Sequence, residues 1–308
     1  MRLAATLAIQ TNDALGEVPM WDAARQRLIW SDIAAGVVHE AQADTAGGWR
    51  EGRRWDVGRP VSAALPRADG RLIAVSGVEI VNIDEAGKVD MFARLDADPE
   101  LVVFNDAKCD SSGRLWAGTS SKDLRSHHGC LYCIRPDGTL TRTLTNVTLS
   151  NGMAWSPDDS TFYYIDSSTR VVDAFDFDSG RGTIGNRRPI VTLSAGEGLF
   201  DGMTVDVEGC LWVAVAGAGE IRRYTPDGKL IGTVEVPTLF ASSCAFGGAD
   251  YTELFITTVK MSLHEHSLPI LSAYGLNPAT VNERNSYSGG LFVCRPGVAG
   301  CRSTLFAG

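Results

Sequence analysis

The amino-acid sequence predicts an all-β fold, a six-bladed β-propeller. Three observations support this prediction. A short apolar run recurs six times along the 308 residues, at intervals of 43 to 49 residues. Turn-forming Asp-Gly and Pro-Asp-Gly sequences punctuate the chain between these runs. The chain also lacks a segment of twelve or more residues with the apolar periodicity of an amphipathic helix.

Each apolar run is six residues long and rich in β-branched and aromatic side chains, which is typical of a buried strand. The six runs are residues 27–32, 71–76, 114–119, 161–166, 210–215 and 253–258. A second strand-like run and another turn follow most of them, so each repeat has room for about four strands and forms one blade. Because no linker rich in Pro or Ser interrupts the repeats, we predict a single domain over residues 1–308.

The two ends of the repeat array carry further predictions. The N-terminal run from Leu3 to Ile9 is expected to pair with the last blade and close the ring, because closure hides the free edges of the sheets. Residues 260–288 form the longest stretch without a strand pattern, and we expect a long loop over one face. Its two histidines, His264 and His266, are expected to be solvated loop residues, with contact to a substrate or a second metal as the alternative.

Composition excludes several classes of function. The net charge of −9 disfavours binding to nucleic acid. An apolar stretch of about 18 residues is absent, which argues against a transmembrane helix, and the first ten residues do not resemble a signal peptide. Seven cysteines without such a peptide predict reduced thiols and a cytoplasmic location. Cys130 and Cys133 have Cys-x-x-Cys spacing but no second pair, so we interpret them as structural thiols.

Four polar clusters lie ten or eleven residues before the second position of an apolar run, and therefore at equivalent places in four blades. They are centred on Glu17, Asn105-Asp106, Asn151 and Asp201. We expect them in the loops that enter the core strands, from which they would converge on the propeller axis. Oxygen ligands of this kind suit one divalent metal ion, Ca²⁺, Mg²⁺, Mn²⁺ or Zn²⁺. The alternative is that the Asn-Gly and Asp-Gly pairs are ordinary turns.

At these clusters the sequence resembles the SMP-30/gluconolactonase/regucalcin-like family. The likeness extends from about Leu15 to Gly300 and rests on a series of motifs in the same order. The matching stretches are residues 15–21, 105–108, 113–119, 150–158, 173–178, 201–206, 243–248 and 289–292.

The resemblance implies a six-bladed propeller with a central metal site formed by Glu17, Asn151 and Asp201. It also implies that Asp201 acts as the general acid or base, and that Asn105 contacts the substrate near the metal. The implied activity is hydrolysis of a small-molecule lactone, an aldono-1,4- or 1,5-lactone, to the hydroxy acid.

Two substrate-contacting positions of the family differ in this sequence. Val103 stands where family members often carry Arg, which removes a side chain that grips hydroxyl or carbonyl groups. Asp123 stands where regucalcin-like members have another acid, and it is shorter by one methylene group. These departures leave the three metal positions intact but favour a less polar substrate.

Two other functions therefore stay open. One is a metal-dependent enzyme of the same fold that acts on a non-sugar lactone or an ester, or that isomerises a carbonyl substrate. The other is a non-catalytic propeller that binds Ca²⁺ or a small ligand. A Ser-based nucleophilic triad is disfavoured, because the sequence has no Gly-x-Ser-x-Gly motif.

Overall fold

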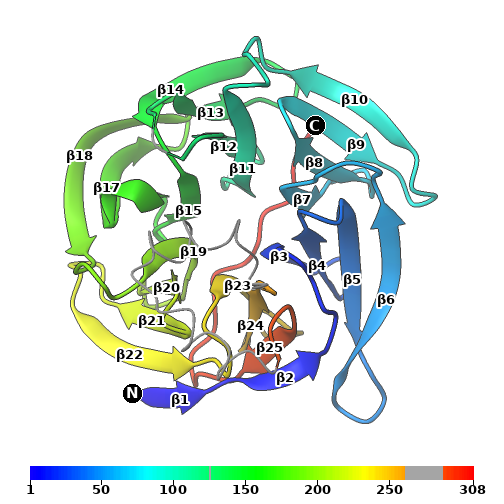
Figure 1. Cartoon of the computed structure of the whole chain (residues 1–308), viewed down its shortest axis with the longest axis vertical. Coiled ribbons are helices and arrows are strands. Elements are labelled where there is room, and N and C mark those ends of the chain that lie inside the picture. The colour runs from blue at the N-terminus through cyan, green and yellow to red at the C-terminus, as the bar shows by residue number, and fades with distance from the viewer. Residues whose placement is uncertain (125, 261–286) are drawn as a thin grey trace.

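The computed structural model describes residues 1–124, 126–260 and 287–308. Six sheets of mainly antiparallel strands stand around a central axis like the blades of a propeller (Figure 1), so the predicted all-β, six-bladed architecture is confirmed. The regular elements of the described residues are strands and one helical turn, the 3-10 turn η1 (Ser167–Thr169). In these residues no helix has the length and apolarity needed to span a bilayer.

Each blade is built from consecutive strands, and the first strand of each blade lies nearest the axis (Figure 1). The blades are β3–β6 (Gly16–Asp22, Arg27–Asp32, Val37–Ala43, Trp49–Asp56), β7–β10 (Ala63–Pro66, Leu72–Ser76, Glu79–Ile83, Val89–Arg94), β11–β14 (Val102–Cys109, Leu115–Ser121, Gly129–Ile134, Leu140–Val147), β15–β18 (Ser150–Trp155, Thr161–Asp166, Val171–Asp178, Thr183–Thr192), β19–β22 (Leu199–Val205, Leu211–Ala216, Glu220–Tyr224, Leu230–Glu235) and β23–β25 (Ala241–Gly247, Glu253–Thr258, Leu291–Cys294).

The N-terminal segment closes the ring, as predicted. Strand β2 (Thr6–Ile9) pairs antiparallel with β25 and supplies the outer strand of the last blade. The preceding strand β1 (Arg2–Ala4) pairs parallel with β22 of the fifth blade, a contact that the sequence did not indicate. The predicted long loop lies almost wholly outside the described residues, as do His264 and His266.

The six apolar runs found in the sequence correspond to the second strands of the blades, β4, β8, β12, β16, β20 and β24. These strands are almost wholly buried, because each blade packs a neighbouring blade against both of its faces. The expectation that the polar clusters lie in loops before these strands was wrong. They lie within the innermost strand of each blade. The ten or eleven residues between a polar cluster and the following apolar run cover most of this strand and the hairpin turn after it.

A buried aspartate organises the turn between the first two strands in the third and fifth blades. The Asp110 carboxylate accepts hydrogen bonds from the indole nitrogen of Trp116 at 2.8 Å and from the backbone of Arg114 at 3.1 Å. In the fifth blade, Asp206 accepts the same bond from Trp212 at 2.8 Å. Both carboxylates are fully buried, and their hydrogen bonds offset the cost of burying them. The shared pattern Asp-x-x-Gly-x-Leu-Trp therefore marks a structural motif of the blade.

A buried acid lies where the ring closes. The backbone of Asp13 bonds to the residues that flank the undescribed segment, donating to Gly289 at 2.8 Å and accepting from Lys260 at 3.2 Å. Its carboxylate accepts a bond from the Trp30 indole at 2.8 Å, and its other oxygen lies 3.3 Å from Nε2 of His39. Burial raises the pKa of Asp13 to about 6, although the charge of His39 opposes the shift.

We predict that Asp13 makes stability fall as the pH rises. A carboxyl group whose pKa is raised by folding binds its proton more tightly in the folded state. Its contribution is therefore complete below its unfolded pKa and lost as the pH passes through about 6. Between pH 4 and pH 7.5, the free energy of unfolding of the wild type should fall by about 2 kcal/mol relative to Asp13→Asn. Urea unfolding at both pH values measures this difference, and pH dependences that run parallel for the two proteins would contradict it.

Candidate metal centre

A β-bulge interrupts the innermost strand at each cluster of predicted site residues. The regular pairing breaks after Glu17 in β3, after Phe104 in β11, after Asn151 in β15 and after Phe200 in β19. Of the two inner strands without a predicted site residue, β7 pairs with β8 without a break, and β23 has a break between Ala241 and Ser243. A bulge bends its strand and changes the direction of a side chain. The bulges therefore explain how strand residues direct polar groups towards the axis.

Each bulge is supported by a side chain from a neighbouring blade. In all four cases, the carbonyl oxygen of the residue just before the site residue accepts this hydrogen bond. The donors and acceptors are Ser242 Oγ to Gly16 at 2.6 Å, Ser62 Oγ to Phe104 at 2.7 Å, Asn105 Nδ2 to Ser150 at 2.8 Å, and Ser167 Oγ to Phe200 at 2.6 Å. These bonds satisfy buried carbonyl groups and hold the site backbone in place.

Glycine follows two of the site residues because the neighbouring blade is too close for a side chain. A Cβ atom at Gly152 would lie 2.6 Å from the carbonyl oxygen of Asp201. At Gly202 it would lie 2.1 Å from the hydroxyl of Ser243. Both glycines lie within strands, so the alternative that Asn151-Gly152 and Asp201-Gly202 form turns was wrong.

Four predicted site residues meet at the end of the channel where the inner strands begin. Glu17, Asn151 and Asp201 come from three blades and are 9%, 5% and 9% exposed. The Asn151 side chain lies close enough to Asp201 to lower the pKa of its carboxylate, against the larger effect of burial, and Asn105 Nδ2 lies 3.3 Å from Asn151 Oδ1. Asn151 is also fixed from behind, since its Nδ2 donates to Ser167 Oγ at 2.8 Å.

A third carboxylate, Asp106, belongs to this cluster. Burial raises the pKa of Glu17 well above its usual value, and the charges of Asp201 and Asp106 raise it further. Burial and the Asp106 charge likewise raise the pKa of Asp201. The pKa of Asp106 itself is raised by burial to about 6, against the effect of Lys108. Asp106 was not among the predicted ligands. Its position next to Asn105, in one of the four polar clusters, could have indicated that it belongs to the site.

The cluster has the composition of a cation site. Glu17, Asp106 and Asp201 are buried carboxylates, and of these three only Asp106 interacts with an ammonium group. That group belongs to Lys108, whose Nζ donates to the carbonyl oxygen of Met203 at 2.7 Å. Buried carboxylates without enough positive charge are unfavourable, and a divalent cation would relieve this. Two carboxylates and an amide oxygen are ligands that hard divalent ions accept. The described residues therefore fit the predicted metal.

The two remaining predicted positions, Val103 and Asp123, are less buried than the acidic cluster. Val103 is partly exposed in β11, two residues before Asn105, and pairs with Ser120. Asp123 is exposed after the end of β12, and its carboxylate accepts hydrogen bonds from the backbone and the hydroxyl of Ser126 at 2.9 and 2.5 Å. Asn105 thus contacts Asn151 of the buried cluster, whereas the Asp123 carboxylate bonds to Ser126, three residues further along the chain.

Two other groups of potential ligands are engaged in structural bonds. In the group Asp13, Asp32 and His39, the Asp32 carboxylate already accepts backbone hydrogen bonds from Ala14 and Leu15 at 2.9 and 3.1 Å. The group around Asp206 is occupied by the bonds that organise its turn. All seven cysteines are unpaired, and Cys130 and Cys133 are buried in β13, consistent with structural thiols.

Comparisons of the sequence and of the fold with known proteins point to the same family. The family model described as "SMP-30/Gluconolactonase/LRE-like region" matches residues 15–260. Regucalcin from Gallus gallus is 38% identical over 253 residues, which cover 80% of this chain and 83% of the relative. A calcium-binding protein, regucalcin, from Agrobacterium tumefaciens has a solved structure with a TM-score of 0.86 and 25% identity, covering 99% of this chain and 98% of that one.

A second solved structure, described as a luciferin-regenerating enzyme, superposes equally well. Its TM-score is 0.85 at 26% identity, with 99% of this chain and 100% of that chain covered. The matched segment contains all the predicted site residues, from Glu17 to Asp201. By sequence and by fold, this chain belongs to the SMP-30/gluconolactonase/LRE-like family.

Proposed function

We propose that this protein is a metal-dependent lactonase, with Glu17, Asn151 and Asp201 as the metal ligands. The observation that carries the proposal is the convergence of two buried carboxylates and an amide on bulged inner strands. The family name supports the reaction class, since it includes gluconolactonase. The proposed reaction opens the ring of a lactone with water and releases the hydroxy acid.

Asp201 is the proposed general base. Burial beside Asp106 raises its pKa, so it holds a proton more readily than an exposed aspartate would. It takes a proton from the attacking water and gives it to the ring oxygen that leaves. A bound divalent ion would supply Lewis acidity toward the lactone carbonyl. Asn105, whose amide is held by the Ser150 carbonyl at 2.8 Å, orients the substrate beside Asp201.

For the substrate, we propose an aldono-1,4- or 1,5-lactone, with Asp123 and Val103 at the outer contacts. The partly exposed Val103 favours one alternative, a lactone or ester with an apolar group at this position. The two other alternative functions are isomerisation of a carbonyl substrate and binding of Ca²⁺ or a small ligand without catalysis. Calcium is the first metal to test, because the Agrobacterium relative is described as calcium-binding.

The proposal predicts hydrolysis that depends on a divalent metal. Proton release from sugar and non-sugar lactones should be measured on untreated protein, after EDTA, and after addition of Ca²⁺, Mn²⁺, Zn²⁺ or Mg²⁺. We expect EDTA to remove at least about 90% of the activity and one of the ions to restore it, because Lewis acidity contributes several kcal/mol. The relative rates of hydrolysis of sugar and non-sugar lactones show whether the pocket around Val103 prefers a polar or an apolar substrate.

The same assay separates the candidates. Full turnover in EDTA, with metal analysis showing none bound, would exclude metal-dependent hydrolysis. Metal bound at one equivalent without hydrolysis of any lactone would exclude the lactonase and favour the binding propeller or the isomerase. The control is Arg295→Gln, because Arg295 is 73% exposed and pairs with Glu253 on the outer surface.

A further inference from the structure

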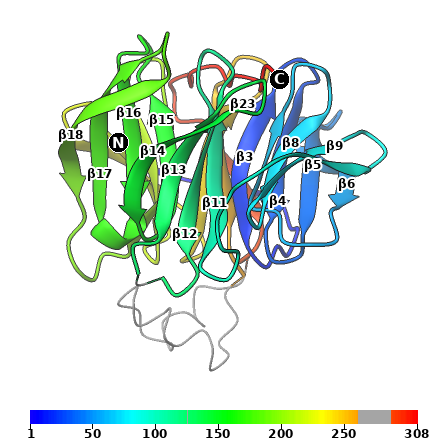
Figure 2. The same ribbon diagram turned by 90° about the horizontal axis from the view of Figure 1, so that it is seen from above.

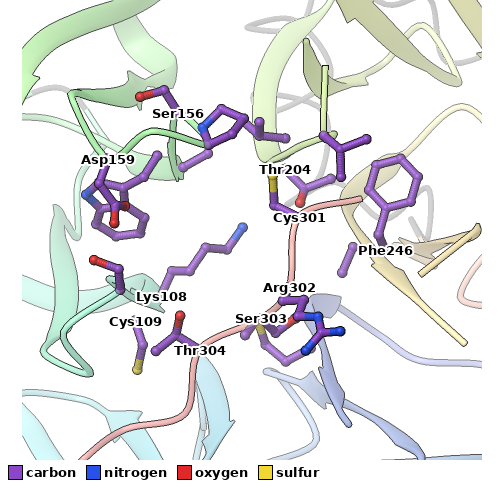
Figure 3. A pocket seen from close by; sticks show the side chains of 18 residues that line it. Lys108, Cys109, Ser156, Asp159, Thr204, Phe246, Cys301, Arg302, Ser303 and Thr304 are labelled. Carbon is purple, nitrogen blue, oxygen red and sulfur yellow. The ribbon is translucent and has the colours of Figure 1, made fainter. Parts of the chain in front are cut away.

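The end of the channel opposite the acidic cluster opens into a cavity of about 370 Å³. We call it the rear cavity. It is lined by the last residues of the inner strands, including Lys108 of β11 and Thr204 of β19, and by residues 301–304 of the C-terminal segment (Figure 3). Its volume is within the range of pockets that hold small molecules. It is separate from the site of the proposed reaction, which lies where the inner strands begin.

The C-terminal segment is a fixed wall of this cavity. It crosses the face of the propeller at which the inner strands end (Figures 1 and 2). Backbone hydrogen bonds of 2.8 to 3.1 Å attach it at both ends of the crossing. They join Gly300 to Tyr251, Cys301 to Val205, Phe306 to Pro66, and Ala307 to Gly113. The backbone of residues 301–304 is therefore held across the channel, with the Arg302 side chain exposed and those of residues 301, 303 and 304 partly buried.

The charges that face the rear cavity are predominantly positive. Lys108 extends its ammonium group towards the middle of the cavity, and Arg302 lies on the crossing segment (Figure 3). One of the three Lys108 donors is used by the Met203 carbonyl at 2.7 Å. Arg302 forms no ion pair with the part of the chain that the structure describes. Two cations and one carboxylate, Asp159, line the cavity in a protein of net charge −9, and the Lys108 ammonium also interacts with Asp106 of the acidic cluster.

Beside apolar side chains such as Val205 and Phe246, the cavity is lined by hydroxyl groups. They belong to Ser111, Ser156, Thr204, Ser303 and Thr304. Hydroxyl groups bind the hydroxyls of a ligand, while ammonium and guanidinium groups bind oxyanions through charge-assisted hydrogen bonds. We propose that the rear cavity binds the oxyanion of a small hydroxylated molecule, a carboxylate or a phosphate, with Lys108 and Arg302 as its charged contacts.

Calorimetric titration tests the proposal with three probes. Gluconate represents a hydroxylated carboxylate, inorganic phosphate an oxyanion without a carbon chain, and glucose a neutral polyol. We expect at least one anion to bind and glucose not to bind. Arg302→Gln should weaken anion binding roughly tenfold, because a hydrogen bond to a charged group is lost. Lys108→Met should weaken it as well, and Arg295→Gln should not.

A second variant locates the bound anion. Glu17→Gln alters the proposed metal centre and leaves the rear cavity intact, so anion affinity should be unchanged in this variant. Failure of both anions to bind, equal affinity in Arg302→Gln and the wild type, or loss of binding in Glu17→Gln would each overturn the proposal. None of these results depends on lactone hydrolysis, so the proposed function stands or falls separately.

Discussion

Replacement of Asp201 by Asn is expected to reduce kcat for lactone hydrolysis by roughly 10³-fold. General bases contribute about 10² to 10⁴ in rate, and an amide cannot accept the proton of the attacking water. Asn keeps the size of Asp and retains an oxygen that a metal accepts, so binding of the ion should be weakened less than turnover. The burial of Asp201 leaves little room for a water to replace its carboxylate.

Two measurements make this result specific to the proton transfer. The metal content of Asp201→Asn, determined by elemental analysis, should stay near that of the wild type at saturating metal, and its melting temperature should not fall. The matched control is Asp137→Asn, in an exposed turn where the carboxylate accepts a bond from the backbone of Thr139 at 2.9 Å. Wild-type turnover in Asp201→Asn would exclude this residue as the base.

Replacement of Asp206 by Ala is expected to lower the free energy of unfolding by about 3 to 5 kcal/mol. The fully buried Asp206 carboxylate pairs with Arg223 Nη2 at 2.6 Å and accepts bonds from the Trp212 indole at 2.8 Å and the Cys210 backbone at 3.0 Å. Alanine would leave these donors without their acceptor inside the blade. The melting temperature should fall by about 10 °C.

Thermal unfolding of Asp206→Ala and Asp137→Ala compares a buried with an exposed turn aspartate. The second variant should unfold close to the wild-type temperature, since the Asp137 carboxylate is solvated. If Asp206→Ala also unfolded at that temperature, the bonds to Trp212 and Arg223 would not stabilise the blade.

The repeat made the propeller predictable from the sequence. Each blade buries a central strand on both faces, so the six apolar runs recur at a nearly constant interval. The place of the polar clusters within the blade was less predictable. A bulged strand that carries Asn151-Gly152 has the same local sequence as a turn, and only the approach of Asp201 from the next blade explains the glycine.

Part of the site depends on contacts between blades, which local sequence does not encode. Glu17, Asn151 and Asp201 could be predicted because each lies at the same place in its repeat. Residues at the same place in successive blades lie around one axis. Ser62, Ser167 and Ser242 carry no such signal, since a serine near a strand end is common. Their role became visible only in the structure, where each hydroxyl donates to the carbonyl oxygen of the residue just before a site residue.

Closure of the ring by its own N-terminus has a consequence for the order of folding. Strand β2 meets β25 across a separation of 287 residues, as in the bond from Thr6 to Val293. During synthesis on the ribosome, β2 and the first blade therefore emerge long before β25, the strand with which β2 pairs. The proposed ligands Glu17 and Asp201 come from the blades on either side of the last blade. The acidic centre is thus completed last, when its carboxylates are first confined together away from water.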